Sequence, residues 1–247
     1  ITIGKIWFSI FSILLILRIV DDLSDIQLDR ILHPERGLPS GKIDSEHLKT
    51  AAVVLGCVLI VINRGWLGSS LIFPVSGLYF LYFKNKVKIS LKFQYFLTNL
   101  IFFIIPFYSR LAGTAVIDYS TLWLGLFIGF SVVAHDIAHS IDDSATRRQP
   151  ILNSSASPRP IVSSILATGG YLLAGVSGTV FFISAEHPVI FLLLLIVTSI
   201  QICALLRKLI HNPLSMNARL FYVPGFTFFL LPLTGLILDG MKNLIKF

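Results

Sequence analysis

Eight long apolar segments, separated by short polar or charged stretches, limit what this chain can fold into. A helix needs about 20 mostly apolar residues to cross a bilayer. The segments are continuous, whereas the strands of a membrane barrel are short and alternate apolar with polar residues. They run over approximately 4–29, 46–63, 67–83, 93–111, 119–142, 159–184, 188–210 and 219–240. We therefore predict an all-α, polytopic membrane helical bundle with eight transmembrane helices.

The composition agrees with a membrane setting. Hydrophobic residues make up 55% of the chain and charged residues 13%, with a mean hydropathy of +0.82, whereas a soluble domain has roughly 25% charged residues. No polar low-complexity linker divides the sequence, so residues 1–247 are predicted to form a single integral-membrane domain. Cys57 and Cys203 both lie in apolar segments, and we interpret them as buried thiols rather than as a disulfide.

Basic residues fall mostly on one side of the predicted bundle. If the chain alternates between two faces, most of the 20 Lys and Arg residues lie in loops on the face where the first segment ends. The positive-inside rule makes that face cytoplasmic. This topology accounts for much of the net charge of +7, because loop lysines set orientation and contact membrane lipid headgroups. The charge therefore gives no reason to predict binding to nucleic acid.

A row of carboxylates ends the first apolar segment. Asp21, Asp25 and Asp29 recur every four residues, with Asp22 beside them and Arg18 one turn earlier. Residues four apart share one face of a helix, and carboxylates in one row repel each other unless a cation neutralises them. Ionisable side chains in or near membrane helices are costly and usually functional. We interpret this row as a candidate metal site.

A second acidic cluster ends the fifth apolar segment, and it consists of Asp136, His139, Asp142 and Asp143. Both clusters fall on the predicted cytoplasmic face. Mg²⁺ prefers oxygen ligands, taking one or two carboxylates and completing its shell with water and substrate phosphates. Basic loops next to the clusters suit phosphate charge, and the apolar interior suits a hydrocarbon tail. The predicted substrate class is an isoprenyl diphosphate. Metal ions and basic side chains would stabilise the pyrophosphate as it departs.

The two clusters and the loop after the first resemble motifs of the UbiA-type intramembrane prenyltransferase superfamily. This superfamily includes 4-hydroxybenzoate polyprenyltransferases and membrane terpene cyclases. Residues 21–29 match its Asn-x-x-x-Asp-x-x-x-Asp signature, with Asp21 in the Asn position. Residues 33–42 resemble its Arg-Pro-Leu-Pro-Ser-Gly-Lys loop, with Gly37 in place of the first Pro. Residues 136–143 resemble its Asp-Ile-x-Asp-x-x-Gly-Asp signature: Asp136 and Asp143 match, but His139 stands where the family usually has Asp.

The resemblance implies nine helices around a central cavity, with both acidic motifs at one membrane face. The first motif lies on the second helix of the family, so a further helix is expected before Ile1. The implied metal ligands are Asp21, Asp22, Asp25, Asp29, Asp136 and Asp143. The implied diphosphate contacts are Arg36, Lys42, Lys84 and Arg147, and the implied catalytic residues are Asp25, Asp136 and His139.

Two polar residues keep more than one interpretation. Neutral histidine is a poor magnesium ligand, so His139 is expected to donate a hydrogen bond to diphosphate, to act as a base, or to pack near a helix end. Asn99 lies inside the fourth apolar segment. It either lines the central cavity or holds neighbouring helices together by hydrogen bonding.

Three classes of function remain open at this stage. The leading one is magnesium-dependent transfer of a prenyl group from its diphosphate to an aromatic or quinone-precursor acceptor. The alternative is a terpene cyclase, in which the carbocation attacks its own double bonds without an acceptor. A transporter is less favoured, because transporter sites lie near the bilayer midplane, whereas both clusters adjoin polar loops. The product distinguishes the two enzymes: a prenylated acceptor, or a cyclic terpene.

Overall fold

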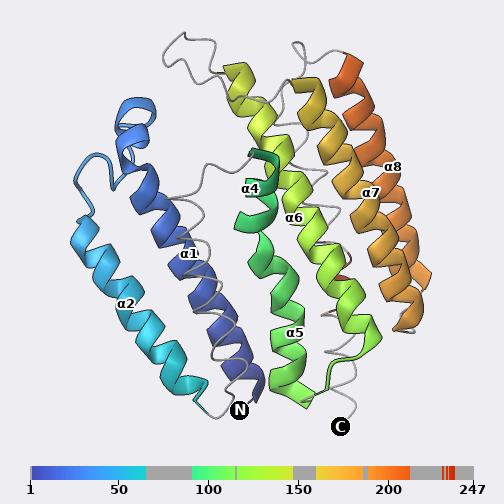
Figure 1. The fold of residues 1–247 in the computed structure, drawn as a ribbon, viewed down its shortest axis with the longest axis horizontal. Helices are drawn as coiled ribbons and strands as arrows, with labels where there is room; N and C mark the ends of the chain where they lie inside the picture. Colours follow the sequence, from blue (N-terminus) through green and yellow to red (C-terminus); the bar gives the residue numbers. More distant parts are fainter. Residues whose placement is uncertain are drawn as a thin grey trace. The chain divides into compact units, whose positions relative to one another are not determined.

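In the computed structural model, the parts of the chain that the structure describes are all helical or loop. They comprise residues 2–64, 91–114, 116–146, 160–185, 189–211 and positions 230, 232 and 234–236. The helices are α1 (Thr2–Leu32), α2 (Ser45–Ile62), α4 (Leu91–Thr98), α5 (Leu100–Thr114), α6 (Tyr119–Thr146), α7 (Pro160–Ser184) and α8 (Val189–His211), as drawn in Figure 1. The prediction of an all-α chain is confirmed for these ranges.

Six of the predicted apolar segments coincide with these helices. The other two, 67–83 and most of 219–240, lie outside the described residues, so the count of eight spans stays a prediction. Within the described ranges, four stretches are long and apolar enough to cross a membrane: Ser45–Ile62, Tyr95–Ala112, Tyr119–His139 and Val162–Ser184. A shorter apolar helical stretch covers Phe191–Ala204.

Large apolar side chains lie on the outside of these helices as well as inside. On α2, Val53 is 65% exposed and Val61 is 63% exposed, and on α7, Ile183 is 65% exposed. A water-soluble surface rarely presents so many contiguous apolar groups. Acyl chains cover such groups in a bilayer, because lipid tails are as apolar as the side chains themselves.

The chain divides into two compact units, which we describe separately. The first unit comprises residues 1–87 and 108–116, and the second comprises residues 88–107 and 117–247. In the first unit, α1 and α2 pack against each other and run in opposite directions (Figure 1). Three fully buried polar side chains tie this unit together at the end of α2, and they are Ser9, Asn63 and Tyr108.

Asn63 is the centre of that buried polar group. Its Nδ2 donates to the Oγ of Ser9 at 3.0 Å and to the carbonyl of Leu59 at 2.9 Å. The hydroxyl of Tyr108 donates to the Oδ1 of Asn63 at 2.7 Å. Buried polar groups are tolerated when they are hydrogen-bonded in this way. The network therefore connects α1, the end of α2 and the last part of α5.

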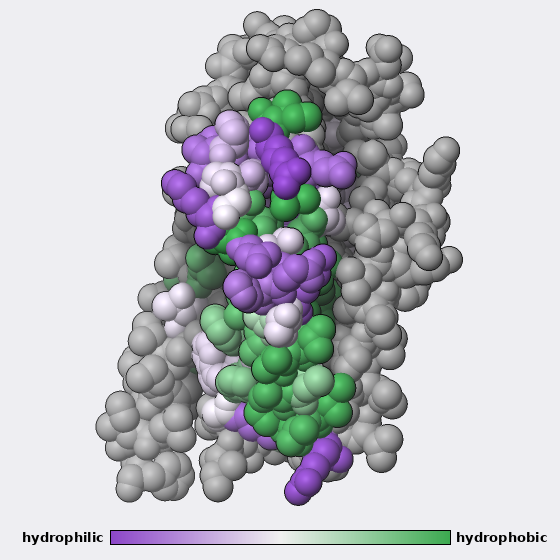
Figure 2. Space-filling view, turned by 90° about the vertical axis from the view of Figure 1, so that its left-hand side faces the viewer, coloured by the Kyte–Doolittle hydropathy of each residue, from purple (hydrophilic) through white to green (hydrophobic). Residues whose placement is uncertain are grey.

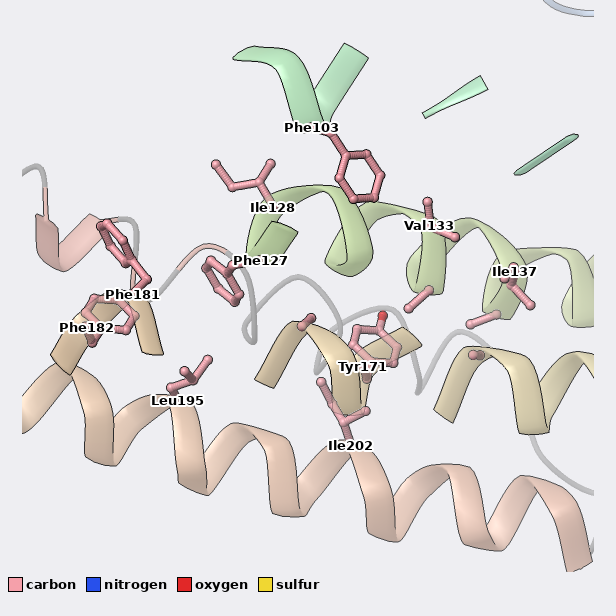
Figure 3. Close-up of a cluster of buried hydrophobic side chains, with 14 residues drawn as sticks. Phe103, Phe127, Ile128, Val133, Ile137, Tyr171, Phe181, Phe182, Leu195 and Ile202 are labelled. Atoms are coloured by element: carbon pink, nitrogen blue, oxygen red, sulfur yellow. The ribbon is translucent and has the colours of Figure 1, made fainter. Parts of the chain in front are cut away.

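In the second unit, α6, α7 and α8 run alternately up and down, and α7 packs against both of the others (Figure 1). Their buried side chains form one apolar core, which Figure 3 shows between the three helices. Phe103 of α5 adds to this core from the side of α6, and Leu195 and Ile202 of α8 point from the opposite side. Close packing of this kind depends on small residues where two membrane helices meet.

Gly170 lies where α7 packs tightly against α6. A Cβ added at Gly170 would lie 2.9 Å from the Cβ of Ala134, whereas a Cβ added at the neighbouring Gly169 would meet nothing within 4 Å. The Cβ of alanine is fixed to the backbone and cannot rotate away. A larger residue at Gly170 therefore has to push the two helices apart.

We expect Gly170→Ala to destabilise the protein by about 1–3 kcal/mol, the usual range for overpacking. Thermal unfolding of purified protein in detergent measures this, with intrinsic fluorescence as the signal. Gly169→Ala is the matched control and should be neutral or stabilising by up to about 1 kcal/mol through helix propensity. Equal melting temperatures for the two variants would contradict the packing of α6 against α7 at Gly170.

Candidate functional site

The acidic row of the first motif lies along about the last three turns of α1. Arg18, one turn earlier, provides a counter-ion for its first two members. The Nη2 of Arg18 lies 2.9 Å from the Oδ1 of Asp22, and its Nη1 lies 3.7 Å from the Oδ2 of Asp21. These side chains are more than one-third exposed, so the ion pairs contribute at most about 1 kcal/mol each. Their main effect is to reduce the repulsion within the row.

Asp29, at the end of the row, pairs with Arg36 of the loop that follows α1. The Nη1 of Arg36 lies 3.0 Å from one carboxylate oxygen of Asp29 and 3.2 Å from the other. The Asp29 side chain is only 16% exposed and the Arg36 side chain is 51% exposed. The resemblance implied a metal ligand at Asp29 and a diphosphate contact at Arg36. The structure brings these two residues together as partners of each other.

Backbone hydrogen bonds explain how the chain returns Arg36 to α1. The amide of His33 donates to the carbonyl of Asp29 at 2.7 Å, and the amide of Arg36 donates to the carbonyl of His33 at 3.1 Å. The amide of Ser40 then donates to the carbonyl of Arg36 at 3.0 Å. The loop is therefore a series of tight turns, which return the Arg36 side chain to Asp29, the last carboxylate of the row.

The backbone conformation of Gly41 explains why the Pro-Ser-Gly segment of this loop has a glycine. Its φ angle is +76°, a left-handed conformation that glycine adopts without steric cost. Lys42 follows directly, and its side chain is exposed. Asp44 then caps α2, because its Oδ1 accepts a hydrogen bond from the amide of Glu46 at 2.9 Å. The loop thus presents two basic side chains, Arg36 and Lys42, from a defined backbone.

Hydrophilic residues gather toward one end of this part of the molecule. Figure 2 faces the side of Figure 1 on which α2 and α1 lie, and its hydrophilic residues concentrate in the upper half while hydrophobic ones dominate below. The acidic row ends where α1 meets the loop. A polar end and an apolar body are the pattern expected of helices that enter a bilayer.

In the second unit, Asp136 lies on α6 and has a partner from another helix. The Nδ2 of Asn99 donates to the Oδ2 of Asp136 at 2.6 Å, and Asn99 is 4% exposed. Asn99 stands at the break between α4 and α5, where its Nδ2 also donates to the carbonyl of Tyr95 at 2.9 Å. The expected role of Asn99 in holding neighbouring helices together is confirmed, and the residue that it holds, Asp136, belongs to the second motif.

His139 is exposed on α6, one turn after His135. The two imidazole rings lie with centroids 6.5 Å apart at an interplanar angle of 65°. Tyr171 of α7 is 2% exposed, and Figure 3 shows its hydroxyl group directed toward α6. His135 and Tyr171 were not among the residues singled out in the sequence. The four-residue spacing from His139 is a signal for His135, whereas nothing local distinguishes Tyr171 from an ordinary core residue.

Several expected site residues receive no structural test. Lys84 and Arg147 lie outside the described residues, and Asp142 and Asp143 belong to α6 without described side chains. The acidic row of α1 lies in the first unit and Asp136 in the second. The expectation that the two motifs face each other across a cavity therefore stays a prediction.

The carboxylates of the row suit a hard cation because they offer oxygen ligands and because their side chains are accessible. Asp21 and Asp22 keep more than one-third of their side-chain surface accessible, and Asp25 is partly exposed. Among the residues that the structure describes, no three His, Cys, Asp or Glu side chains converge closely enough to hold a metal ion. Mg²⁺ typically takes only one or two protein carboxylates, with water and phosphate oxygens as its other ligands. The donors present therefore fit Mg²⁺ bound together with a phosphorylated substrate.

The fold of this chain is shared with a solved structure of digeranylgeranylglyceryl phosphate synthase, described in membranes. The likeness has a TM-score of 0.69 at 21% sequence identity, and it covers 95% of this chain and 85% of that one. No family model matches the chain, and no curated protein matches it. In the described part of the chain, the four long apolar stretches agree with an integral membrane protein.

Arg36→Gln should loosen the loop after α1, because it removes the cation that holds Asp29. We expect amide hydrogen exchange in residues 33–42 to accelerate roughly fivefold, the equivalent of about 1 kcal/mol for a partly exposed ion pair. The control is Glu35→Gln, which removes only the exposed contact between Glu35 and His33 at 3.6 Å. Hydrogen exchange with mass spectrometry measures both. Unchanged exchange in Arg36→Gln would show that the ion pair does not hold the loop.

Proposed function

We propose that this protein is a magnesium-dependent membrane prenyltransferase. It ionises an isoprenyl diphosphate at the membrane face that carries the acidic motifs and transfers the prenyl group to an acceptor. The observation that carries this proposal is the acidic row of α1 together with the basic loop that folds back onto it, on the fold of a membrane prenyltransferase. The basic loops of the predicted topology make this face cytoplasmic.

The role of each side chain follows from its charge and position. The carboxylates of Asp21, Asp22 and Asp25 hold the metal. Mg²⁺, when bound, neutralises diphosphate oxygens and so stabilises the charge that develops on the leaving group. Lys42 contacts the diphosphate from the loop, and Lys84 and Arg147 are proposed to do so from other loops of the same face.

Arg36 has two partners in this scheme. In the structure it pairs with Asp29. As long as this ion pair is formed, Asp29 is a weaker candidate for a metal ligand, because Arg36 occupies both of its carboxylate oxygens. A diphosphate carries more negative charge than one carboxylate. It therefore competes for the Arg36 guanidinium, which is already half-exposed. Binding of substrate would release Asp29 and make its oxygens available to the metal.

The chemical step breaks the bond between C1 of the prenyl chain and the diphosphate oxygen, and both electrons leave with pyrophosphate. The acceptor then attacks C1 and loses a proton. Asp136 is proposed to support the metal and diphosphate from α6. His139 donates a hydrogen bond to diphosphate or takes up the proton. The acceptor class follows from the resemblance as an aromatic or quinone precursor, and the name of the structural neighbour adds glyceryl phosphates to the acceptors to be tested.

The experiment that tests this function starts without an acceptor. Purified protein is incubated with Mg²⁺ and geranyl, farnesyl or geranylgeranyl diphosphate, and the organic extract is analysed by mass spectrometry. Acceptors of the two classes are then added. A prenylated acceptor that forms only in their presence supports prenyl transfer. A cyclic terpene formed without acceptor would replace this function with that of a cyclase.

Asp25→Ala is expected to abolish turnover and magnesium-dependent substrate binding while the protein still folds. Asp25 has the central place in the acidic row. The substitution removes a proposed metal ligand, and alanine is small enough to cause no steric clash. Glu46→Gln is the matched control, since Glu46 is an exposed carboxylate paired with Lys49 outside the row. Activity near that of the unaltered protein in Asp25→Ala would refute the metal assignment.

His139→Asp restores the ligand that the family has at this position. Because carboxylate oxygen suits Mg²⁺ better than imidazole nitrogen, the variant should stay active and reach half-maximal rate at a Mg²⁺ concentration no higher than that of the unaltered protein. Initial rates over a magnesium titration measure this. Complete loss of activity would instead make the imidazole part of the chemistry.

A further inference from the structure

We propose that Asn99 is a positioning residue that fixes the carboxylate of Asp136 for its task. This inference rests on the proposed function, in which Asp136 supports the metal and diphosphate. Its basis is a part-buried contact between two residues that are 37 apart in sequence: the Nδ2 of Asn99 lies 2.6 Å from the Oδ2 of Asp136, and Asn99 itself is 4% exposed.

The orientation of the Asn99 amide follows from its partners. Both the carbonyl oxygen of Tyr95 and the carboxylate oxygen of Asp136 accept hydrogen bonds, so the nitrogen end of the amide has to face them. An amide nitrogen carries two hydrogens, one for each acceptor. The bond to Tyr95, on the same helical turn, holds the amide so that the second hydrogen points at Asp136.

The neutral charge of Asn99 matters for what Asp136 can do. A Lys or Arg at this place would neutralise the carboxylate and reduce its attraction for a cation. An amide donor instead satisfies one oxygen, leaves the full negative charge on Asp136 and restricts rotation of the carboxylate plane. Partners of this kind, beyond the ligands themselves, typically change metal affinity 10-fold to 100-fold when they are removed.

The break between α4 and α5 places Asn99 where it can reach α6. Helix α4 ends at Thr98, α5 begins at Leu100, and the amide of Phe102 donates to the carbonyl of Asn99 at 3.0 Å. The Oγ1 of Thr98 donates to the same Tyr95 carbonyl at 3.3 Å. Thr98 therefore lies at the break beside Asn99 and bonds to the same carbonyl. It provides the matched control.

The test compares Asn99→Ala, Asn99→Gln and Thr98→Val in full-length protein in detergent. Two quantities are measured: the Mg²⁺ concentration for half-maximal pyrophosphate release from a prenyl diphosphate in the presence of an acceptor of the proposed classes, and the rise in melting temperature caused by Mg²⁺ with inorganic pyrophosphate. We expect Asn99→Ala to raise that Mg²⁺ concentration about 10-fold and to remove most of the thermal shift. Asn99→Gln, which keeps an amide donor, should recover part of both, and Thr98→Val should match the unaltered protein within about twofold.

A purely structural role for Asn99 gives a different pattern. In that case the melting temperature without ligand falls for Asn99→Ala and Thr98→Val alike, while the magnesium dependence of the folded fraction stays unchanged. That result would overturn the inference. If Asn99→Ala does not fold, Asn99→Leu replaces it, because leucine has a similar size and suits a membrane helix. The same two outcomes then apply to that variant.

The two measurements also separate this inference from the proposed function. If the unaltered protein releases no pyrophosphate, yet shows a thermal shift that Asn99→Ala loses, prenyl transfer is wrong and the role of Asn99 stands. If the unaltered protein is active and Asn99→Ala keeps both its magnesium dependence and its thermal shift, the role of Asn99 is wrong and prenyl transfer stands. Absence of both responses in the unaltered protein would overturn both.

Discussion

Negative charge at the end of an apolar helix has to be met by a partner, and the described part of the structure is organised around this requirement. An unpaired carboxylate in a poorly solvated place has a large free-energy cost. Asp21 and Asp22 meet Arg18, Asp29 meets Arg36, and Asp136 meets Asn99. These partners differ from one another in exposure and in charge. They therefore differ in how readily a metal ion or a phosphate would displace them.

These differences give the two acidic motifs different characters. The row on α1 is partly exposed and is balanced by guanidinium groups, which also bind phosphate well. In the proposed function, this row would open when a diphosphate arrives. Asp136 is held by a neutral amide, Asn99, that is itself buried. In the same proposal, that amide would hold the carboxylate in a fixed orientation.

Much of the fold follows from the hydropathy pattern. Apolar segments predicted at 46–63, 119–142, 159–184 and 188–210 coincide closely with α2, α6, α7 and α8. The segment at 93–111 is divided by a break that sequence reasoning did not foresee, because Asn99 reads as one polar residue inside an apolar run. At the break, the side chain of Asn99 bonds to the carbonyl of Tyr95, four residues earlier, and to Asp136 of α6, and only the second bond is a tertiary feature.

The site shows the same division between local and tertiary information. The regular spacing of Asp21, Asp25 and Asp29 was enough to predict a shared helix face. The pairing of Asp29 with Arg36 depends on the turns between them, and the contact of Asn99 with Asp136 joins distant parts of the sequence. Neither can be obtained from periodicity, which describes one helix at a time.

The most direct test of the account is to locate the metal. Crystals grown with Mn²⁺ in place of Mg²⁺ and a non-ionisable thiolodiphosphate analogue of the prenyl substrate would show the ion by its anomalous scattering. The account predicts anomalous density against the carboxylates of Asp21, Asp22 or Asp25, with the diphosphate next to it and Arg36 turned away from Asp29. Density at another place, or a diphosphate bound without any ion near the acidic row of α1, would contradict it.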